Sequence, residues 1–373
     1  MKRYLVVFGI LLLPAGSSGQ PRVQWRLEEV VRIGEADGPL ALTRINGMTE
    51  VDGLLFISQT AEQLIRVISK DGAGVRTMGQ RGDGPGEFRR IDFLGYVDGE
   101  IVAVDLAAAR RTFFSPDGSS IETLRLPWPP RARPFAWLGA PYAVRNRNAI
   151  VSGSVPNEFI SEYPSMPVLL ANSASEVVDS VSSYDVREMV VVIGDATRST
   201  GFRHPLHRGS RQSVSPDGSY FVEVAQDGQQ VVITWLDTET LARSHRRVDL
   251  PPAVVPDAYV DAQTTRIREA LEGRGWRLSR REVVEALRFP ERVLAIDVVQ
   301  VVQGGGVWMR ERTFEDPQAV WWFVEPGQGR TLRAAAPASI RVLSQAGDTI
   351  WGSDTDDLDV DYVVGMRLVP AGG

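Results

Sequence analysis

The amino-acid sequence predicts an all-β fold, a six-bladed β-propeller that is closed by the strand at its own N-terminus. Three observations lead to this prediction: turn motifs that recur at a fixed spacing, short apolar stretches between Gly- and Asp-rich turns, and a last repeat that lacks one strand. We expect a signal peptide in residues 1–19 and a single propeller domain in residues 20–373. A helical insert is expected at about 256–290, between blades four and five.

The first residues have the composition of a signal peptide. Lys2 and Arg3 form a basic start, residues 4–13 are an apolar run, and Ser17 and Gly19 are the small residues that precede a cleavage site. The run is too short for a membrane-spanning helix, which needs about 20 apolar residues. We therefore expect a periplasmic or secreted protein without a membrane span after cleavage; a retained N-terminal anchor is the alternative.

Charge and composition exclude several classes of function. The chain carries 41 basic and 47 acidic side chains, a formal net charge of −6, which argues against a nucleic-acid partner. It has no cysteine, so a thiolate nucleophile and a cysteine zinc site are ruled out. Every cation except Lys2 and Lys70 is an arginine. This bias indicates either anion recognition or a coding preference, and the scattered positions favour the latter.

The repeat is the strongest signal in the chain. Three pairs of turn motifs share one spacing of roughly 46 residues: Val-Asp-Gly at 51–53 and 97–99, Ser-x-Asp-Gly at 69–72 and 115–118, and a Gly-rich turn that begins at Gly34 and Gly79. The second unit contains four apolar or β-branched stretches, at 93–96, 101–105, 112–115 and 121–126. Four strands in a repeat of about 40–50 residues are typical of one propeller blade.

The same first hairpin can be found in each later unit. Six candidate turns occur, at 52–53, 98–99, 147–148, 217–218, 305–306 and 347–348. The last unit ends after three strands, near residues 362–369, and the stretch 25–33 can supply the fourth strand. Such closure removes an exposed sheet edge. A β-sandwich is the alternative, but a sandwich does not require identical turns at one spacing.

A family resemblance follows from these motifs. The Gly-rich turn at 79–88 ends in Phe, a strand at 101–105 ends in Asp, and Arg110 precedes the Phe-Ser-Pro-Asp-Gly turn at 114–118. This order resembles the NHL repeat of exported bacterial six-bladed propellers, with a good match over 74–126. The resemblance implies the propeller fold but assigns no function, because most members of that group have no assigned activity.

Long irregular segments are expected on one face of the propeller. They are 127–134, 155–164, 185–211, 251–292 and 354–361, and each falls between blades or between the second and third strands of a blade. A functional site should lie on this face, because loops on a rigid scaffold carry sites. In the helical insert, Ser279 and Glu282 form a capping box. The narrow apolar stripes favour a packing brace over a lid or a partner surface.

The leading interpretation is a recognition or scaffold propeller that binds a protein, peptide or glycan on this loop-rich face. Trp128, Arg131 and Arg133 are the candidate ligand-binding residues, since an indole can stack on a sugar ring and guanidinium groups bind anions. No catalytic residue can be assigned. The alternative is a metal-dependent lactonase- or lyase-type enzyme with a site at the channel mouth, but Asp105 and Asp354 have no identifiable partners there.

Metal binding is only weakly indicated, and no cofactor is required. Asp354, Asp356 and Asp359 lie in an acidic loop that could hold a structural calcium ion, although the EF-hand spacing fails. His204 and His207 could share a zinc ion, but zinc needs a third ligand. A solvated loop is the favoured interpretation of the acidic segment.

Overall fold

The structure is a computed structural model of the 373-residue chain. It describes the residues 23–119, 122–126, 136–137, 142–154, 165–174, 176–188, 190–194, 199–206, 209–314 and 318–371. The expected signal peptide, residues 1–19, lies outside the described residues.

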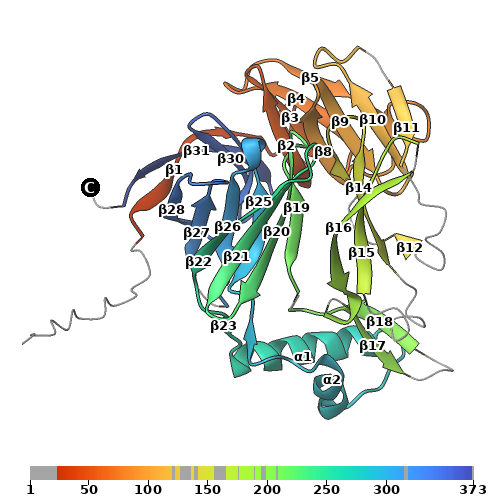
Figure 1. Cartoon of the computed structure of the whole chain (residues 1–373), viewed down its shortest axis with the longest axis vertical. Helices are drawn as coiled ribbons and strands as arrows, with labels where there is room; N and C mark the ends of the chain where they lie inside the picture. Colours follow the sequence, from red (N-terminus) through yellow and green to blue (C-terminus); the bar gives the residue numbers. More distant parts are fainter. Residues whose placement is uncertain are drawn as a thin grey trace, which may run out of the picture.

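The strands form six blades (Figure 1), and contacts between the first strands of neighbouring blades place these strands on the inside of the ring. Blade one consists of β2 (Ile45–Val51), β3 (Leu54–Gln59), β4 (Leu64–Ser69) and β5 (Val75–Met78). Blade two consists of β8 (Phe93–Val97), β9 (Glu100–Asp105), β10 (Arg110–Phe114) and β11 (Glu122–Arg125). Blade three consists of β13 (Tyr142–Ala143), β14 (Ala149–Ser154), β15 (Ser165–Ala171) and β16 (Val177–Asp185), and β12 (Ala136–Trp137) also pairs with β14.

The second half of the ring repeats this pattern. Blade four consists of β19 (Arg211–Val214), β20 (Tyr220–Asp227), β21 (Gln230–Asp237) and β22 (Arg243–Asp249). Blade five consists of β25 (Ile296–Val301), β26 (Val307–Glu311), β27 (Gln318–Val324) and β28 (Thr331–Pro337). Blade six consists of β29 (Arg341–Ala346), β30 (Thr349–Thr355), β31 (Asp361–Pro370) and β1 (Trp25–Ile33). The prediction of a six-bladed all-β propeller is confirmed.

The N-terminal strand closes the ring, as predicted. β1 pairs antiparallel with β31 along its whole length, and Trp25 and Arg26 also pair in parallel with β28 of blade five. Leu27 and Ile33 of β1 are buried. Blade six therefore combines the two ends of the chain, and β31 has no free edge.

The hairpin turns form because their residues accept positive φ. Asp52 and Gly53 have φ angles of 50° and 79°, and Asp98 and Gly99 have 52° and 84°. Two successive residues with positive φ are the requirement of the type I′ turn, whose twist matches that of the flanking strands. All six predicted first-hairpin turns lie between the first and second strands of a blade.

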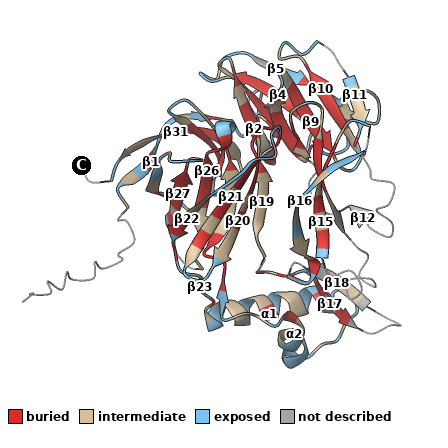
Figure 2. Cartoon of the chain, in the orientation of Figure 1, coloured by how far each residue is buried: buried red, intermediate tan, exposed pale blue. Residues whose placement is uncertain are grey.

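The core lies between adjacent blades, where the middle strands are buried (Figure 2). Trp235 of blade four is fully buried against blade five, and its indole N–H donates to the carbonyl of Gly305 at 2.7 Å. Trp308, Trp321 and Trp322 of blade five are also buried. These tryptophans stabilise the packing of the blades.

The prediction that residues 185–211 form an irregular segment is wrong in one respect. It contains a short helix η2 (Val186–Glu188) and a hairpin of β17 (Val190–Gly194) and β18 (Ser199–Arg203). Val191 and Ile193 are buried, whereas Val192 between them is 39% exposed. This alternation is the period of a half-buried strand.

The segment 251–292 contains two helices, α1 (Asp257–Glu272) and α2 (Arg280–Leu287), flanked by the paired strands β23 (Ala253–Val254) and β24 (Arg292–Val293). The capping box of Ser279 and Glu282 opens α2. Another small pair, β6 (Gln80–Arg81) and β7 (Glu87–Phe88), lies in the Gly-rich turn before blade two. No helix in the part of the chain that the structure describes is long and apolar enough to cross a membrane.

Candidate ligand site on the loop-rich face

Two insertions from different blade junctions pack together on the loop-rich face. We call them the cap, which consists of β17, β18, α1 and α2. Val191 and Ile193 of β17 pack against Leu271 of α1 and against Val283 and Leu287 of α2. Figure 1 shows α1 and α2 beyond the ends of the blades, beside β17 and β18. The helices therefore contact the hairpin that joins blades three and four, and do more than brace their own junction.

His204 joins the two insertions. Its Nε2 lies 2.8 Å from the carbonyl oxygen of Leu287, and its Nδ1 accepts a hydrogen bond from the amide of Leu206 at 2.9 Å. The ring is buried and lies edge-on to Phe289, with centroids 5.5 Å apart. Both ring nitrogens thus have backbone partners, which leaves no lone pair for zinc in this arrangement. The second zinc candidate, His207, lies outside the described residues.

Aromatic side chains connect the cap to blade five. The ring of Tyr259 on α1 lies edge-on to Phe314, with centroids 4.9 Å apart, and to Phe289 at 6.5 Å. Phe314 follows β26, at the same end of the blade as the start of β25. Edge-to-face pairs of this kind contribute roughly 0.5–1.5 kcal/mol beyond their buried area. The aromatic contacts therefore hold α1 against the loop-rich end of blade five.

Three arginines lie beneath this contact, and we call Arg203, Arg211 and Arg312 the arginine cluster. Arg211 begins β19 and Arg312 follows β26, while Arg203 ends β18 of the cap. The inner strands β19 and β25 are neighbours, and the amide of Arg312 donates to Ala295 just before β25 at 2.7 Å. The cluster is therefore placed at the inner edge of the interface between blades four and five, at its loop-rich end.

Arg312 is held in one orientation. Its Nε donates to the carbonyl of Leu294 at 3.0 Å and its Nη2 to the carbonyl of Ile296 at 3.1 Å. Burial lowers the pKa of Arg312, and the carboxylate of Asp297 partly opposes this shift. Asp297 itself is bound by Arg310, with Nε–Oδ1 and Nη2–Oδ2 distances of 2.9 and 3.1 Å. The nearby carboxylate is therefore already shared with a fourth arginine.

Arg211 differs from Arg312 because its side chain has no hydrogen-bond partner among the described residues. Its Nε is buried, and no described residue accepts a hydrogen bond from its guanidinium group. Burial first, and then the positive charges of Arg312 and Arg203, lower the pKa of Arg211 to about 10, although the carboxylate of Asp297 opposes the change. A pKa of about 10 keeps the group charged at neutral pH. An unpartnered buried cation is costly, so this position is a candidate for binding an anion.

The ligand-binding residues predicted from the sequence cannot be placed against this cluster. Trp128, Arg131 and Arg133 lie outside the described residues. The acidic candidates are described: Asp354 lies in β30, and Asp356 and Asp359 lie in the turn from β30 to β31, which is shorter than the expected segment 354–361. The arginine cluster therefore consists of residues that the sequence analysis does not single out, and the three predicted residues stay predictions.

Asp354 and Asp356 of this acidic segment have hydrogen-bond partners among the described residues. Asp354 accepts from Arg32 at 2.7 Å, and Oδ1 of Asp356 accepts from the amide of Val360 at 2.9 Å. Hydrogen bonds from backbone amides, that of Val360 first, lower the pKa of Asp356. Asp359 adopts a φ of 60° within the turn. Among the described residues, no three His, Asp or Glu side chains are grouped as metal ligands.

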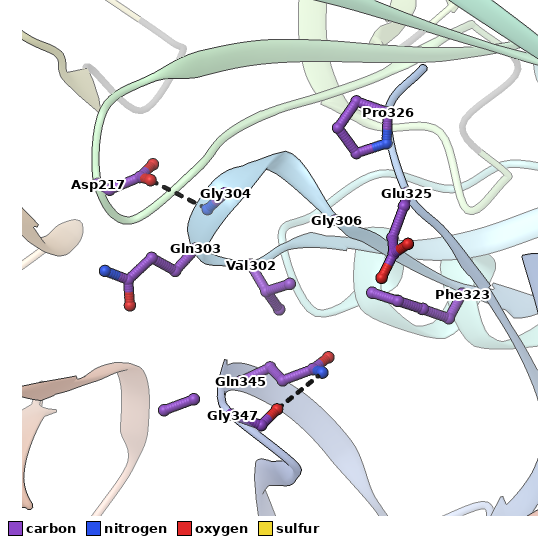
Figure 3. A pocket seen from close by; sticks show the side chains of 11 residues that line it. Asp217, Val302, Gln303, Gly304, Gly306, Phe323, Glu325, Pro326, Gln345 and Gly347 are labelled. Carbon is purple, nitrogen blue, oxygen red and sulfur yellow. Dashed lines mark hydrogen bonds between the residues drawn. The ribbon is translucent and has the colours of Figure 1, made fainter. Parts of the chain in front are cut away.

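A separate cavity of about 580 Å³ opens on the opposite, hairpin face (Figure 3). It is lined by turns of blades four, five and six. Burial opposes ionisation of Asp217, but hydrogen bonds from Ser215, Ser219 and the Gly304 amide outweigh it and lower the pKa of Asp217. The carboxylate of Asp217 therefore stabilises the turns and is not offered to a ligand.

Sequence reasoning missed the arginine cluster. Arg203, Arg211 and Arg312 span more than a hundred positions and belong to no motif, and scattered arginines favour the interpretation as coding bias. Arg203 and Arg211 are close in the sequence, but Arg312 joins them only because blade four packs on blade five. The near absence of lysine was the one signal in the sequence that was consistent with anion recognition.

Comparison with known proteins supports the fold. A family model described as a 6-bladed beta-propeller matches residues 39–136, which cover blades one and two. The structure of a putative exported protein from Bacteroides fragilis is similar, with a TM-score of 0.53, 12% identity, and coverage of 94% of this chain and 98% of that chain. At this identity the similarity is one of fold alone. No curated protein matches the chain in sequence.

Two enzyme structures are more distant. A PQQ-bound aldose sugar dehydrogenase from Streptomyces coelicolor has a TM-score of 0.44 and 10% identity, over 94% of this chain and 100% of that chain. A putative 6-phosphogluconolactonase from Bacteroides fragilis has a TM-score of 0.37 and 8% identity, over 89% of this chain and 84% of that chain. Similarity at this level says nothing about the activity of this chain.

Proposed function

We propose that this protein acts outside the cytoplasm, in the periplasm or as a secreted protein, as a recognition module that binds a protein, peptide or glycan on its loop-rich face. The single observation that supports this most is the cap, in which two insertions from different blade junctions pack into one body. The hairpin turns of the opposite face stay short, so the elaboration is confined to one side. Loops and insertions on one face of a rigid scaffold commonly carry its binding site.

Trp128, Arg131 and Arg133 remain proposed contact residues on the same face, because they belong to the connection between blades two and three. A structural calcium ion at Asp354, Asp356 and Asp359 also remains a proposal. Nothing in the described part of the chain favours the alternative of a metal-dependent lactonase or lyase.

Quantitative co-purification from the extracytoplasmic fraction tests the proposal. The wild-type protein is compared with the double variant Arg131→Gln and Arg133→Gln, and with Lys70→Gln, a matched loss of a cation on an exposed turn of the hairpin face. We expect a stoichiometric partner that is depleted by the double variant and retained by the control. A partner retained equally by all three proteins, or absent from all three, would count against recognition through this face.

A further inference from the structure

We propose that Arg211 and Arg312, with Arg203 at the rim, bind an oxyanion: a carboxylate, sulfate or phosphate group. The inference rests on the proposed function, because the oxyanion would belong to the ligand recognised on the loop-rich face. It adds the chemistry of that ligand and a site that the predicted contact residues do not include.

The first argument is the unused hydrogen-bonding capacity of the cluster. A guanidinium group has five N–H donors and no acceptor. Arg312 uses its Nε and Nη2 on carbonyls of the chain, which fix the plane of the group, while Nη1 has no described acceptor. Arg211 uses none of its donors on described residues. Two adjacent guanidinium groups with free donors match an oxyanion, which accepts several charge-assisted hydrogen bonds.

The second argument is charge. None of the three arginines forms an ion pair with a described carboxylate, whereas Arg310 beside them is paired with Asp297. Counted over the described side chains, the cluster therefore holds an excess of positive charge at a partly buried position. Like charges close together in a medium of low dielectric constant repel each other strongly, and a bound anion would relieve that repulsion.

The third argument is access. Arg111 of β10 also has buried nitrogens without partners among the described residues. Its side chain is fully buried against the turn at Arg147 and Asn148, so solvent and ligands cannot reach it. Arg211 and Arg312 are only partly buried, and Arg203 is exposed. The exposure of Arg203 leaves the rim of the cluster open to solvent. Burial raises the pKa of Tyr259 in the cap, and the positive charge of Arg312 partly opposes this rise. The cap therefore lies beside the site.

The test is titration of the full-length mature protein with phosphate, sulfate and acetate at constant ionic strength, measured by calorimetry and by thermal melting. Arg211→Gln is the main variant, Arg312→Gln the second, and Arg125→Gln the matched control. Arg125 is an exposed arginine on β11 with no side-chain partner among the described residues. We expect at least one probe to bind the wild type and the control, and to bind Arg211→Gln roughly tenfold or more weakly.

The Arg211→Gln variant also separates a loss of anion binding from a loss of folding. Because the substitution removes a partly buried cation that has no partner among the described residues, its melting temperature without anions should equal or exceed that of the wild type. Arg312→Gln loses two hydrogen bonds to carbonyls and should melt lower. Preference for acetate indicates a carboxylate ligand, and preference for phosphate or sulfate indicates a tetrahedral group.

Two results would overturn the inference. One is that no probe binds the wild type, and the other is that Arg211→Gln and Arg125→Gln bind every probe equally well. Failure of the proposed function is distinguishable from these, because an anion can bind at the cluster when no macromolecular partner co-purifies. Conversely, a partner retained by Arg211→Gln and lost from the Arg131 and Arg133 variant would leave recognition standing and show that this partner does not bind through the arginine cluster.

Discussion

Leu287 of α2 is the side chain on which the integrity of the cap depends most. It is fully buried, and only Val283 and Leu287 of this eight-residue helix are buried. Its carbonyl oxygen is also the partner of His204. The substitution Leu287→Ala removes half of the apolar anchor of α2 and leaves a cavity beside β17.

The expected cost is about 2–5 kcal/mol, the usual range for truncation of a buried leucine. A value near 3 kcal/mol corresponds to roughly a hundredfold increase in the population of the locally open state, since each 1.4 kcal/mol is about a factor of ten. Hydrogen exchange measured by mass spectrometry should therefore accelerate about a hundredfold in α2, α1, β17 and β18. The strands β20 and β21 of blade four should keep their exchange rates.

Val284→Ala is the matched control, because Val284 lies on the same helix and is only partly buried. We expect a change of less than about tenfold there. The reasoning is refuted if exchange in β17 and β18 is unchanged in Leu287→Ala, because the hairpin and the helices would then not form one unit. Equal acceleration in β20 and β21 would refute it as well.

Three further predictions concern the blades. Gly79→Ala should lower the free energy of unfolding in urea by more than about 2 kcal/mol, because the new Cβ would overlap the ring of Phe88. Gly99→Ala is the control: it has open space around the new Cβ and should lower the free energy of unfolding by only about 1 kcal/mol, because of its positive φ. The hydrogen bond from Ser115 and others lower the pKa of Asp117 from 3.8 to about 2, so this carboxylate should stabilise the fold above pH 3.8 and lose that effect as the pH falls towards 2. Urea unfolding of Ser115→Ala against the wild type should differ at pH 7 and converge near pH 2, and a constant difference would contradict this. Deletion of residues 23–33 should expose the edge of β31 and produce dimers or aggregates in size-exclusion chromatography, while a monomer with the melting temperature of the intact protein would contradict closure by β1.

The blades could be predicted from the sequence because each is determined by local turn chemistry. The Asp-Gly pairs at 52–53 and 98–99 require positive φ, and their spacing fixes the repeat. The closing strand was also predictable, since the last repeat lacked one strand and residues 25–33 had the matching pattern. In both cases the signal lies within one repeat or its known period.

The cap and the arginine cluster could not be predicted in the same way. Whether Val191 and Ile193 contact α2 depends on how two blade junctions meet in space, and no local pattern encodes that meeting. The cluster joins Arg211 of blade four to Arg312 of blade five, about a hundred residues apart in the chain. The predicted contact residues Trp128, Arg131 and Arg133 remain predictions, to be tested by the co-purification above.

A crystal structure of the protein soaked with selenate tests the oxyanion site most directly. Selenate has the shape and charge of sulfate, and its selenium atom gives an anomalous signal that locates it without ambiguity. We predict an anomalous peak within hydrogen-bonding distance of the guanidinium groups of Arg211 and Arg312, and its loss in Arg211→Gln crystals. An empty arginine cluster at a selenate concentration that labels other surface positions would contradict the site.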